Sequence, residues 1–281
     1  MSLIPPALAV TGSTGELGGQ VARLLSAAGV KQRLLARTPR KAPPLDGATI
    51  LAAAYENSSA TRTALTGAQT VFMVSASESR ERLDQHCDFV DAAVAAGVHH
   101  LIYVSFVAAA QDAVFTLARD HYATEEYIRA SGLGYTFLRD NFYADFMSDT
   151  VGADGVIRGP AGDGRAALVA RADVARTAAV ILQNPRAHFG ATYDLTGPEA
   201  LNFTQIAQIL SAVGQRQVSF HDETIEEAYA SRAEYGAPKW QVDAWVSTYS
   251  AIAAGAMENV SGDIERITGI PPLSLEQLLR G

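Results

Sequence analysis

The sequence predicts an α/β fold, in which a Rossmann-like, doubly wound parallel sheet is joined by a smaller, mainly helical C-terminal lobe. Two observations lead to this expectation. An apolar run at residues 7–10 leads directly into a turn that carries Gly12, Gly15 and Gly18. Apolar strand candidates then alternate with helical patterns as far as Leu138. Such alternation implies crossover connections in a parallel sheet that is covered by helices on both faces.

The glycine turn joins the first strand to the first helix, because Leu17 and Val21 begin a helical pattern directly after it. Gly12 suits a tight turn, since it has no Cβ. Gly15 lets the backbone come close to a pyrophosphate, and Gly18 lets the helix pack against the strand. The free N–H groups at the start of the helix favour a phosphate. The turn therefore predicts dinucleotide binding.

The remaining elements are read from the same periodicities. In the first half we expect strands at residues 32–36, 48–52, 70–75, 101–104 and 135–138, and helices at 58–65, 82–96 and 115–130. In the second half we expect a glycine-rich loop or hairpin at 152–164, strands at 191–196 and 217–221, and helices at 173–182, 203–213, 223–234, 239–254, 264–268 and 274–279. The predicted domains are a cofactor-binding domain at 1–150, which residues of about 166–200 rejoin, and a substrate-binding lobe at 151–281.

The composition excludes several classes of function. Lys plus Arg number 22 and Asp plus Glu number 30, so the formal charge is −8, and the isoelectric point near 5.2 argues against a nucleic-acid partner. No apolar run reaches the ~18 residues of a membrane span, and the first residues lack the pattern of a signal peptide. We expect a cytoplasmic protein with a small-molecule partner and no membrane partner; whether it forms a homodimer is open. The only cysteine, Cys87, is expected in the core.

The end of the second strand indicates which cofactor binds. An acidic residue there would accept a hydrogen bond from the ribose 2′-OH of NAD. This sequence has Ala36 followed by Arg37, and Arg40 and Lys41 lie close behind. A 2′-phosphate can lie against the guanidinium, so NADP(H) is preferred over NAD(H). The alternative is that these residues form only a solvated basic loop.

The ends of the later strands should face the rest of the cofactor, because ligands bind at the carboxyl ends of a parallel sheet. These ends are residues 74–77, 104–106 and 138–141. Their hydroxyl groups on Ser77 and Ser105 fit an alternative role as ordinary helix caps.

Several of these segments resemble one family, the NmrA-like branch of the atypical short-chain dehydrogenase/reductases, which includes quinone and triphenylmethane reductases. The likeness extends from the first strand to about Leu210. The segments that carry it are Thr11-Gly12-Ser13-Thr14-Gly15-Glu16-Leu17-Gly18-Gly19, Ala96-Gly97-Val98, Tyr103-Val104-Ser105, His121 with Glu125 and Glu126, Ser131-Gly132, residues 138–143, Ala161-Gly162-Asp163-Gly164-Arg165 and Arg171-Ala172-Asp173.

The resemblance implies a nicotinamide-binding domain, a small C-terminal lobe and a substrate cleft between them. By position it implies cofactor contacts from Gly12, Ser13, Thr14, Gly15, Glu16, Leu17, Arg37, Val74, Ser75, Ala76, Asn141 and Phe142. Gly18 in the turn and Ser105 at a strand end complete the predicted cofactor set.

Two positions depart from the wider superfamily. The Tyr-x-x-x-Lys pair that supplies its general acid is replaced by Leu117 and His121, and Leu117 cannot give a proton. An aspartate that meets the adenine in many relatives is replaced by Ala54. His121 is predicted to have a site role, although its place in the helical pattern also fits a polar residue at a helix edge.

The predicted catalytic residues are therefore His121, Asn141 and Tyr143. The predicted substrate-binding residues are Phe106, Phe142, Tyr143 and Phe146, because the last three are aromatic residues just after the last strand of the first half. No metal site is expected, because His99 and His100 have no cysteine or carboxylate pattern around them and read as a surface turn.

The function that we expect is an NADPH-dependent reductase that transfers hydride to a quinone-like or conjugated, electron-poor substrate. The alternative is a non-catalytic sensor that binds NADP(H) and signals redox state, as NmrA-like regulators do. The missing tyrosine favours the sensor, and the likeness to quinone reductases favours the enzyme.

Overall fold

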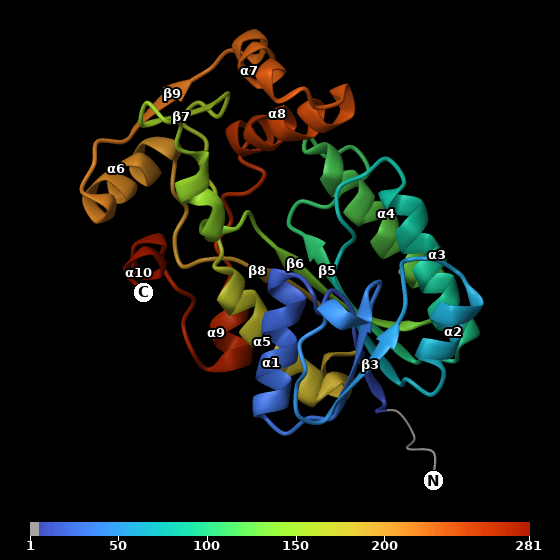
Figure 1. Ribbon diagram of the computed structural model, residues 1–281. Coiled ribbons are helices and arrows are strands. Elements are labelled where there is room, and N and C mark those ends of the chain that lie inside the picture. The colour runs from blue at the N-terminus through green and yellow to red at the C-terminus, as the bar shows by residue number, and fades with distance from the viewer. Residues whose placement is uncertain (1–5) are drawn as a thin grey trace. The chain divides into compact units, whose positions relative to one another are not determined.

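The computed structural model describes residues 6–281, and its elements alternate as predicted (Figure 1). The strands are β1 (Leu8–Val10), β2 (Gln32–Ala36), β3 (Ala48–Ala52), β4 (Thr70–Met73), β5 (His100–Phe106), β6 (Gly134–Asp140), β7 (Val156–Gly159), β8 (Thr192–Leu195) and β9 (Ser219–Asp222). The helices are α1 (Glu16–Ala27), α2 (Ser59–Leu65), α3 (Arg82–Ala95), α4 (Thr116–Ala130), α5 (Arg171–Gln183), α6 (Phe203–Gly214), α7 (Ile225–Arg232), α8 (Lys239–Ala253), α9 (Asp263–Thr268) and α10 (Leu275–Arg280).

Seven strands form one sheet in the order β3-β2-β1-β4-β5-β6-β8. The pairs β1–β2, β1–β4, β2–β3 and β4–β5 are parallel. The strand order therefore reverses beside β1, and this is the point at which doubly wound sheets bind their ligands. The predicted Rossmann-like α/β fold is confirmed.

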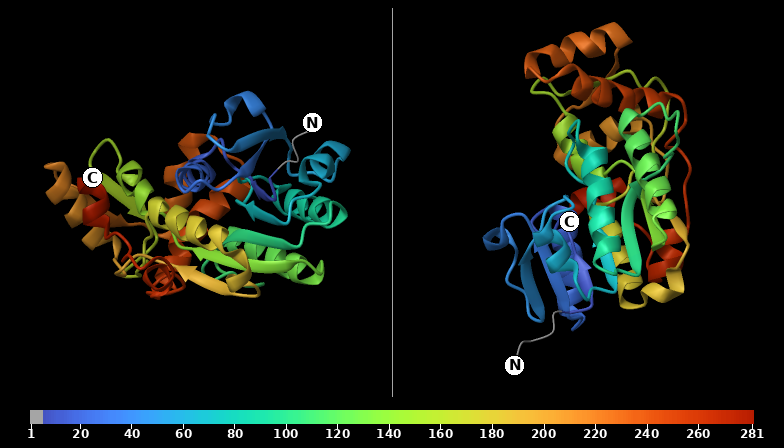
Figure 2. Two further views of the ribbon diagram at one scale, coloured as in Figure 1. Left: turned by 90° about the horizontal axis from the view of Figure 1, so that it is seen from below. Right: turned by 90° about the vertical axis from the view of Figure 1, so that its right-hand side faces the viewer.

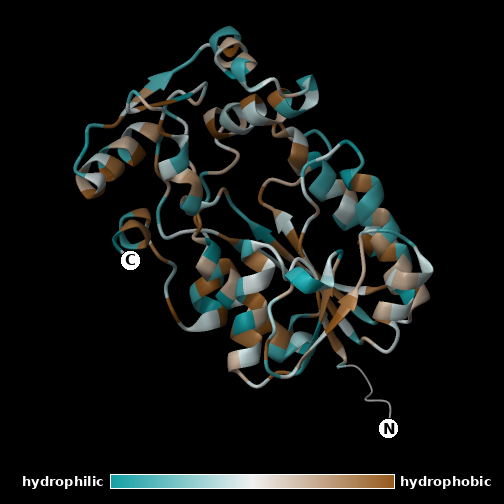
Figure 3. Ribbon diagram, in the orientation of Figure 1, coloured by the Kyte–Doolittle hydropathy of each residue, from teal (hydrophilic) through white to brown (hydrophobic). Residues whose placement is uncertain are grey.

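Helices cover both faces of these strands (Figures 1 and 2). One buried cluster joins α2, α3 and α4 to one face, where Phe89 and Ile128 meet Val71 and Tyr103. Alternate residues, such as Phe72 between Val71 and Met73, point to the other face, as the two-residue period of a strand requires. Figure 3 shows both hydrophobic and hydrophilic residues on most helices, as expected of helices with one buried face.

The chain divides into two compact units. The first unit consists of the residues up to Ser105, Tyr122–Arg139 and Val174–Tyr193. The second unit consists of Phe106–His121, Asp140–Asp173 and Asp194–Gly281. The predicted domain division at residue 150 stays a prediction.

The second unit contains a two-stranded sheet that the sequence did not predict. The stretch expected to be a loop or hairpin contains β7, whose partner is β9 in a parallel pair, with Ile157 opposite Phe220. Helix α6 packs beside this sheet, since the Phe203 ring stacks on Phe220 at 5.2 Å between centroids. The partner strand is about sixty residues away along the chain, so local periodicity could not reveal the pair.

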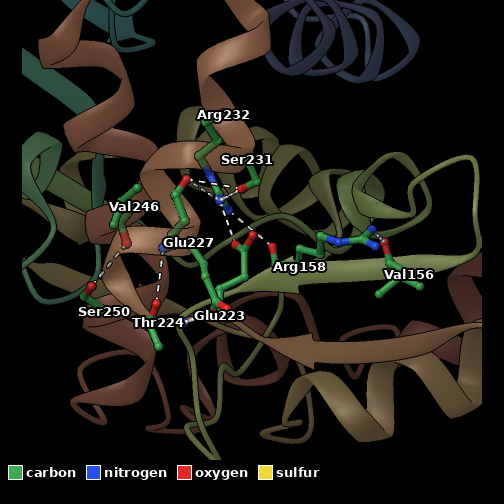
Figure 4. Close-up of polar contacts among 10 residues, drawn as sticks. Val156, Arg158, Glu223, Thr224, Glu227, Ser231, Arg232, Val246 and Ser250 are labelled. Atoms are coloured by element: carbon green, nitrogen blue, oxygen red, sulfur yellow. Dashed lines mark hydrogen bonds and ion pairs between the residues drawn. The ribbon is translucent and has the colours of Figure 1, made fainter.

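A buried ion pair joins β7, β9 and α7 in the second unit (Figure 4). Arg232 Nη1 donates to Glu223 Oε2 at 2.8 Å and to the Ala228 carbonyl at 2.9 Å. Its Nη2 donates to the carbonyl of Arg158 at 3.2 Å. The guanidinium also lies 5.3 Å from the ring centroid of Tyr249 on α8. Since both charged side chains are buried, their pairing is needed to offset the cost of desolvating them.

Two sequence predictions are wrong in the first unit. Cys87 is only half-buried, because the buried side of α3 is formed instead by Arg82, His86, Phe89 and the residues in register with them. His100 is not in a surface turn but buried at the start of β5, where its Nε2 pairs with Thr136 Oγ1 at 2.9 Å. In the part of the chain that the structure describes, no helix is both long and apolar enough to span a membrane.

Candidate active site

The glycine turn between β1 and α1 is shaped by close backbone contacts. Gly12 has a φ of +65°, which residues with a Cβ rarely adopt, and its carbonyl accepts from the Gly15 N–H at 2.9 Å. A Cβ on Gly18 would lie 2.7 Å from the Thr11 carbonyl oxygen and closer still to that of Gly12. The N-cap of α1 is Gly15, which has no side chain to cap the helix. The first N–H groups of α1 are therefore not capped by a side chain and can meet an anion.

A cavity of about 530 Å³ lies beside this turn, entirely within the first unit. Its walls are the turn itself, the residues at and after the ends of β2, β3 and β4, and Gln85 and Phe89 of α3. Of the predicted cofactor residues, it is lined by Gly12, Thr14, Gly15, Glu16, Leu17, Gly18, Arg37, Val74, Ser75 and Ala76. Thus ten residues chosen from sequence meet around one space of the size of ligand pockets.

The other predicted cofactor residues lie elsewhere. Ser13 is buried under the turn, and its hydroxyl has no hydrogen-bond partner within residues 6–281. Ser105 Oγ donates to Glu125 Oε1 at 2.6 Å, and Arg139 donates two hydrogen bonds to the same carboxylate at 2.8 and 2.7 Å. The Ser105 hydroxyl is thus already engaged in a buried charge network.

The charges on the wall of the cavity are few. Arg37 is the first residue after β2 and is exposed, whereas Glu16 and Glu56 carry the opposite charge. The end of β2 itself is Ala36, so no carboxylate stands where one would meet a ribose 2′-OH. Arg40 and Lys41, in the short helix η1 (Pro39–Lys41), are not among the described residues that line the cavity.

Tyr55 ties three strand ends together at this cavity, and sequence reasoning assigned it no role. Its hydroxyl donates to the Val74 carbonyl, so the contact of 2.7 Å with Thr11 Oγ1 has the threonine as donor. Thr11 Oγ1 in turn accepts from the Val74 N–H at 3.0 Å. Burial raises the pKa of Tyr55, which keeps the phenol protonated. The only signal in the sequence was an aromatic residue just after a predicted strand.

His86 and Arg82 on α3 fix the other side of the cavity, and both were missed. The Ala76 N–H donates to His86 Nε2 at 2.8 Å, while Arg82 Nε donates to the Ala76 carbonyl at 3.0 Å. Because Nε2 accepts, the His86 proton is on Nδ1, which lies 2.8 Å from Thr124 Oγ1. Burial, and then the charge of Arg82, lower the pKa of His86 to about 3. His86 is therefore neutral at ordinary pH and positions backbone rather than exchanging protons.

The second unit contains the predicted catalytic and substrate residues. Asn141 is buried, and its amide makes two hydrogen bonds: Nδ2 donates to the Met257 carbonyl at 2.9 Å and Oδ1 accepts from the Phe142 N–H at 2.7 Å. Phe142 is half-buried against the core of this unit. His121 is buried, with its ring 6.0 Å from that of Phe106 between centroids. Phe106 and His121 are therefore neighbours, and their roles in a substrate site stay predictions.

Tyr143 and Phe146 form an aromatic pair under one cation. The Arg171 guanidinium lies 5.1 Å from the Tyr143 ring centroid and 4.9 Å from that of Phe146. Asp145 holds Arg171 by an ion pair of 3.7 Å and by a hydrogen bond of 2.8 Å from its backbone N–H. The Tyr143 hydroxyl donates to Asp140. Burial, and then the negative charge of Asp140, raise the pKa of Tyr143 well above its usual value, so this phenol is a poor acid.

Two further positions concern the chemistry. Leu117, at the place of the superfamily's acidic tyrosine, is buried with 8% of its surface exposed. Within residues 6–281, no three His, Cys, Asp or Glu side chains gather as metal ligands would.

A parallel sheet of this order, with a glycine-lined cavity at the ends of its strands, defines a dinucleotide-binding α/β protein. The chain belongs to the NmrA-like family, whose model matches residues 6–240.

Individual relatives match nearly the whole chain. It is 31% identical to quinone oxidoreductase 2 of Escherichia coli K12 over 96% of both chains. It superposes with a TM-score of 0.89, at 30% identity, on the crystal structure of NADPH-dependent quinone oxidoreductase QOR2 from E. coli complexed with NADPH, over 97% of this chain and 98% of that one. For the Citrobacter sp. triphenylmethane reductase complexed with NADP(H), the TM-score is 0.86 at 29% identity over 97% and 99%. These comparisons confirm the predicted family and the prediction of an oxidoreductase.

Proposed function

We propose that this protein is an NADPH-dependent reductase that transfers hydride to a quinone-like or conjugated, electron-poor substrate. The observation that carries the proposal is the cavity beside the glycine turn, with an uncapped helix start on one side and Arg37 on the other. The relatives crystallised with NADPH and NADP(H) support the same cofactor.

The residues around the cavity fit a dinucleotide phosphate. The φ of Gly12 and the tight approach at Gly18 keep side chains out of the turn, so backbone N–H groups can bind the pyrophosphate. Arg37 can form a charge-assisted hydrogen bond to a 2′-phosphate. Ala36 offers no carboxylate to bind the 2′-OH of NAD or to repel a 2′-phosphate. We therefore assign the preference to NADP(H).

The bound cofactor would supply the hydride, and the protein would supply position and a dry environment. Hydride transfer to a simple ketone gives an alkoxide, whose conjugate acid has a pKa near that of water, about 16. Such a product needs an acid at once. Hydride transfer to a quinone gives a delocalised phenolate, and a phenol pKa is about 10. Leu117 is therefore tolerable for quinones and damaging for ketones.

The side chains of the second unit suggest how that product is handled. Tyr143 is a poor proton donor, because its hydroxyl already donates to Asp140 and its pKa is raised. With Phe146 and Arg171 it offers flat surfaces and a positive charge, which suit a planar substrate that becomes an anion. His121 remains the candidate donor, since an imidazole is a common general acid.

A second function is favoured by one observation. Leu117 occupies the position of the general acid and cannot give a proton. The alternative function is therefore a non-catalytic sensor that binds NADP(H) and reports redox state to a partner. Both functions require the same cofactor cavity, so cofactor binding alone does not separate them.

Turnover separates the two functions. We expect the protein to oxidise NADPH over many turnovers with benzoquinone or naphthoquinone, and only slowly with aliphatic ketones. The loss of the near-ultraviolet absorbance of NADPH measures this oxidation. His121→Ala should lower the quinone rate by about 10²-fold or less. Protein that binds NADPH but is inert with quinones, dyes and ketones would be a sensor. Equal rates on a ketone and a quinone would refute the substrate argument, and full activity of His121→Ala would remove only the histidine from it.

A further inference from the structure

Helix α3 presents to the cavity one polar side chain, that of Gln85, for which the site described above gives no role. Gln85 and Phe89 both line the cavity, and because they are four residues apart they lie on one face of the helix. The Phe89 ring packs 4.9 Å from the ring of Tyr55, between centroids. Tyr55 itself belongs to the wall that follows β3, together with Ala54 and Glu56. Gln85 is therefore one turn before a residue that touches this wall.

The Gln85 amide is unengaged, unlike its neighbours. Arg82 is hydrogen-bonded to the backbone carbonyl of Ala76, and His86 to its backbone N–H. The Gln85 backbone N–H donates to the Glu81 carbonyl at 2.9 Å, as in any helix, but within residues 6–281 its side chain makes no hydrogen bond or ion pair. Gln85 is only half-buried, so the cost of an unpaired amide is modest. A free amide at the wall of a pocket can both donate to and accept from a ligand.

The end of the cavity near β2 and β3 is where the proposed function puts the adenosine, because Arg37 follows β2 and would meet the 2′-phosphate. Adenine needs two complementary partners on one edge, an acceptor for its N6 amino group and a donor for the adjacent ring nitrogen. Ala54 offers neither through its side chain. Glu56 can only accept, whereas a glutamine amide can pair with adenine by two hydrogen bonds at once.

We infer that Gln85 binds the adenine of the cofactor through its side-chain amide. This inference rests on the proposed NADPH binding. It makes α3 contribute twice to the cavity: His86 and Arg82 hold the backbone after β4, and Gln85, on the next position, contacts the base. The missing carboxylate at Ala54 is then replaced from a helix rather than from a strand end.

The test is a thermodynamic cycle between one substitution and one change in the ligand. We would measure the Kd of NADP⁺ and of its 1,N6-etheno analogue, in which the N6 amino group can no longer donate, for the wild type and for Gln85→Leu. Leucine keeps the helix propensity and approximate size of glutamine but removes the amide. We expect Gln85→Leu to weaken NADP⁺ binding about tenfold, which is about 1.4 kcal/mol. The etheno group should cost the wild type at least threefold more than it costs the variant, because both changes remove the same contact.

The control is Gln111→Leu, since Gln111 is an exposed glutamine that does not line the cavity. It should bind both ligands like the wild type. If Gln85→Leu does not fold, Gln85→Met removes the amide with another side chain of good helix propensity. Equal penalties for the etheno group in wild type and variant, or unchanged NADP⁺ binding by the variant, would overturn the inference and leave the proposed function intact. A wild type that binds no NADP(H) would instead overturn the proposed function, and this inference with it.

Discussion

His86 provides the sharpest test of how α3 supports the cofactor cavity. Replacing it by alanine leaves the buried Ala76 N–H without an acceptor, which costs about 1–3 kcal/mol. The change also removes a ring that packs edge-on against Tyr55 and Tyr103, at 6.2 and 5.7 Å between centroids. Since the His86 side chain is fully buried, the empty space that alanine would leave in its place lowers the free energy of unfolding by a similar amount. We expect His86→Ala to lower the free energy of unfolding by about 2–5 kcal/mol.

The same substitution should weaken NADPH binding even where the protein remains folded. Ala76 lines the cavity, and without His86 only its carbonyl would keep a side-chain hydrogen bond, the one from Arg82. We expect the Kd for NADPH to rise about tenfold in His86→Ala, as for the loss of about 1.4 kcal/mol of binding free energy. His86→Gln, which can still accept from the Ala76 N–H, should recover part of the affinity. Unchanged affinity in folded His86→Ala would refute the positioning role.

The pH dependence of unfolding gives an independent measure. The pKa of His86 is about 3 in the folded protein, against an ordinary value of 6.5. As the pH falls below about 6.5, the unfolded chain binds a proton that the folded one does not, so stability decreases, by at most 1.36 kcal/mol per pH unit. From neutral pH to roughly pH 5, His86→Gln should therefore lose about 2 kcal/mol less stability than the wild type. The control His99→Gln, at an exposed histidine, should keep the wild-type slope; identical slopes in all three proteins would show that His86 is not a buried neutral histidine.

Three other substitutions test the site and the fold. Arg37→Ala should reduce the preference for NADPH over NADH roughly tenfold, measured by titrating both cofactors, because a charge-assisted contact contributes about 1.5–3 kcal/mol; a wild type without this preference would contradict the assignment. Gly15→Val should fold, since Gly15 has an ordinary extended φ of −98° and an added Cβ would have only one contact within 4 Å, at 3.4 Å. It should bind no cofactor, because the valine side chain would fill the cavity. Binding by this variant would show that the phosphates lie elsewhere. Arg232→Met should lower the free energy of unfolding by about 3–5 kcal/mol, because it leaves Glu223 buried and unpaired. Adding Glu223→Leu should restore most of this loss. An Arg232→Met variant as stable as the wild type would show that the ion pair is not buried in solution.

The fold could be predicted from sequence because its signals are local. Strands β2 and β3 have the predicted bounds, since each contains a short apolar stretch, at residues 34–36 and 50–52. The prediction for α3 is wrong in detail: the helix is present, but its buried side includes Arg82, which no hydropathy pattern selects, and Cys87 is only half-buried. A buried polar residue looks like an exposed one until its partner is known, and the partner of His86 is a peptide ten residues before it.

The candidate site divides in the same way. The glycine turn and Arg37 could be found because a turn between a strand and a helix fixes its own geometry. The roles of Tyr55 and Gln85 could not, because they depend on how β3 and α3 pack against each other. The role of Asn141 stays a prediction. Its amide, expected to contact cofactor or substrate, also donates to the Met257 carbonyl, more than a hundred residues later, and this contact could not be predicted from local sequence.

These contacts also bear on the kind of reaction that the chain can support. The groups that shape the cofactor cavity are backbone N–H groups and buried side chains that hold backbone, such as Tyr55 and His86, both of which keep their protons fixed at neutral pH. The phenol of Tyr143 is held in its protonated form by a pKa that burial, and then the negative charge of Asp140, raise. Under the proposed function, His121 is then the one predicted site residue left to act as an acid. We therefore expect such a reductase to favour acceptors whose reduced product is stable as an anion, such as a quinone, over unactivated ketones.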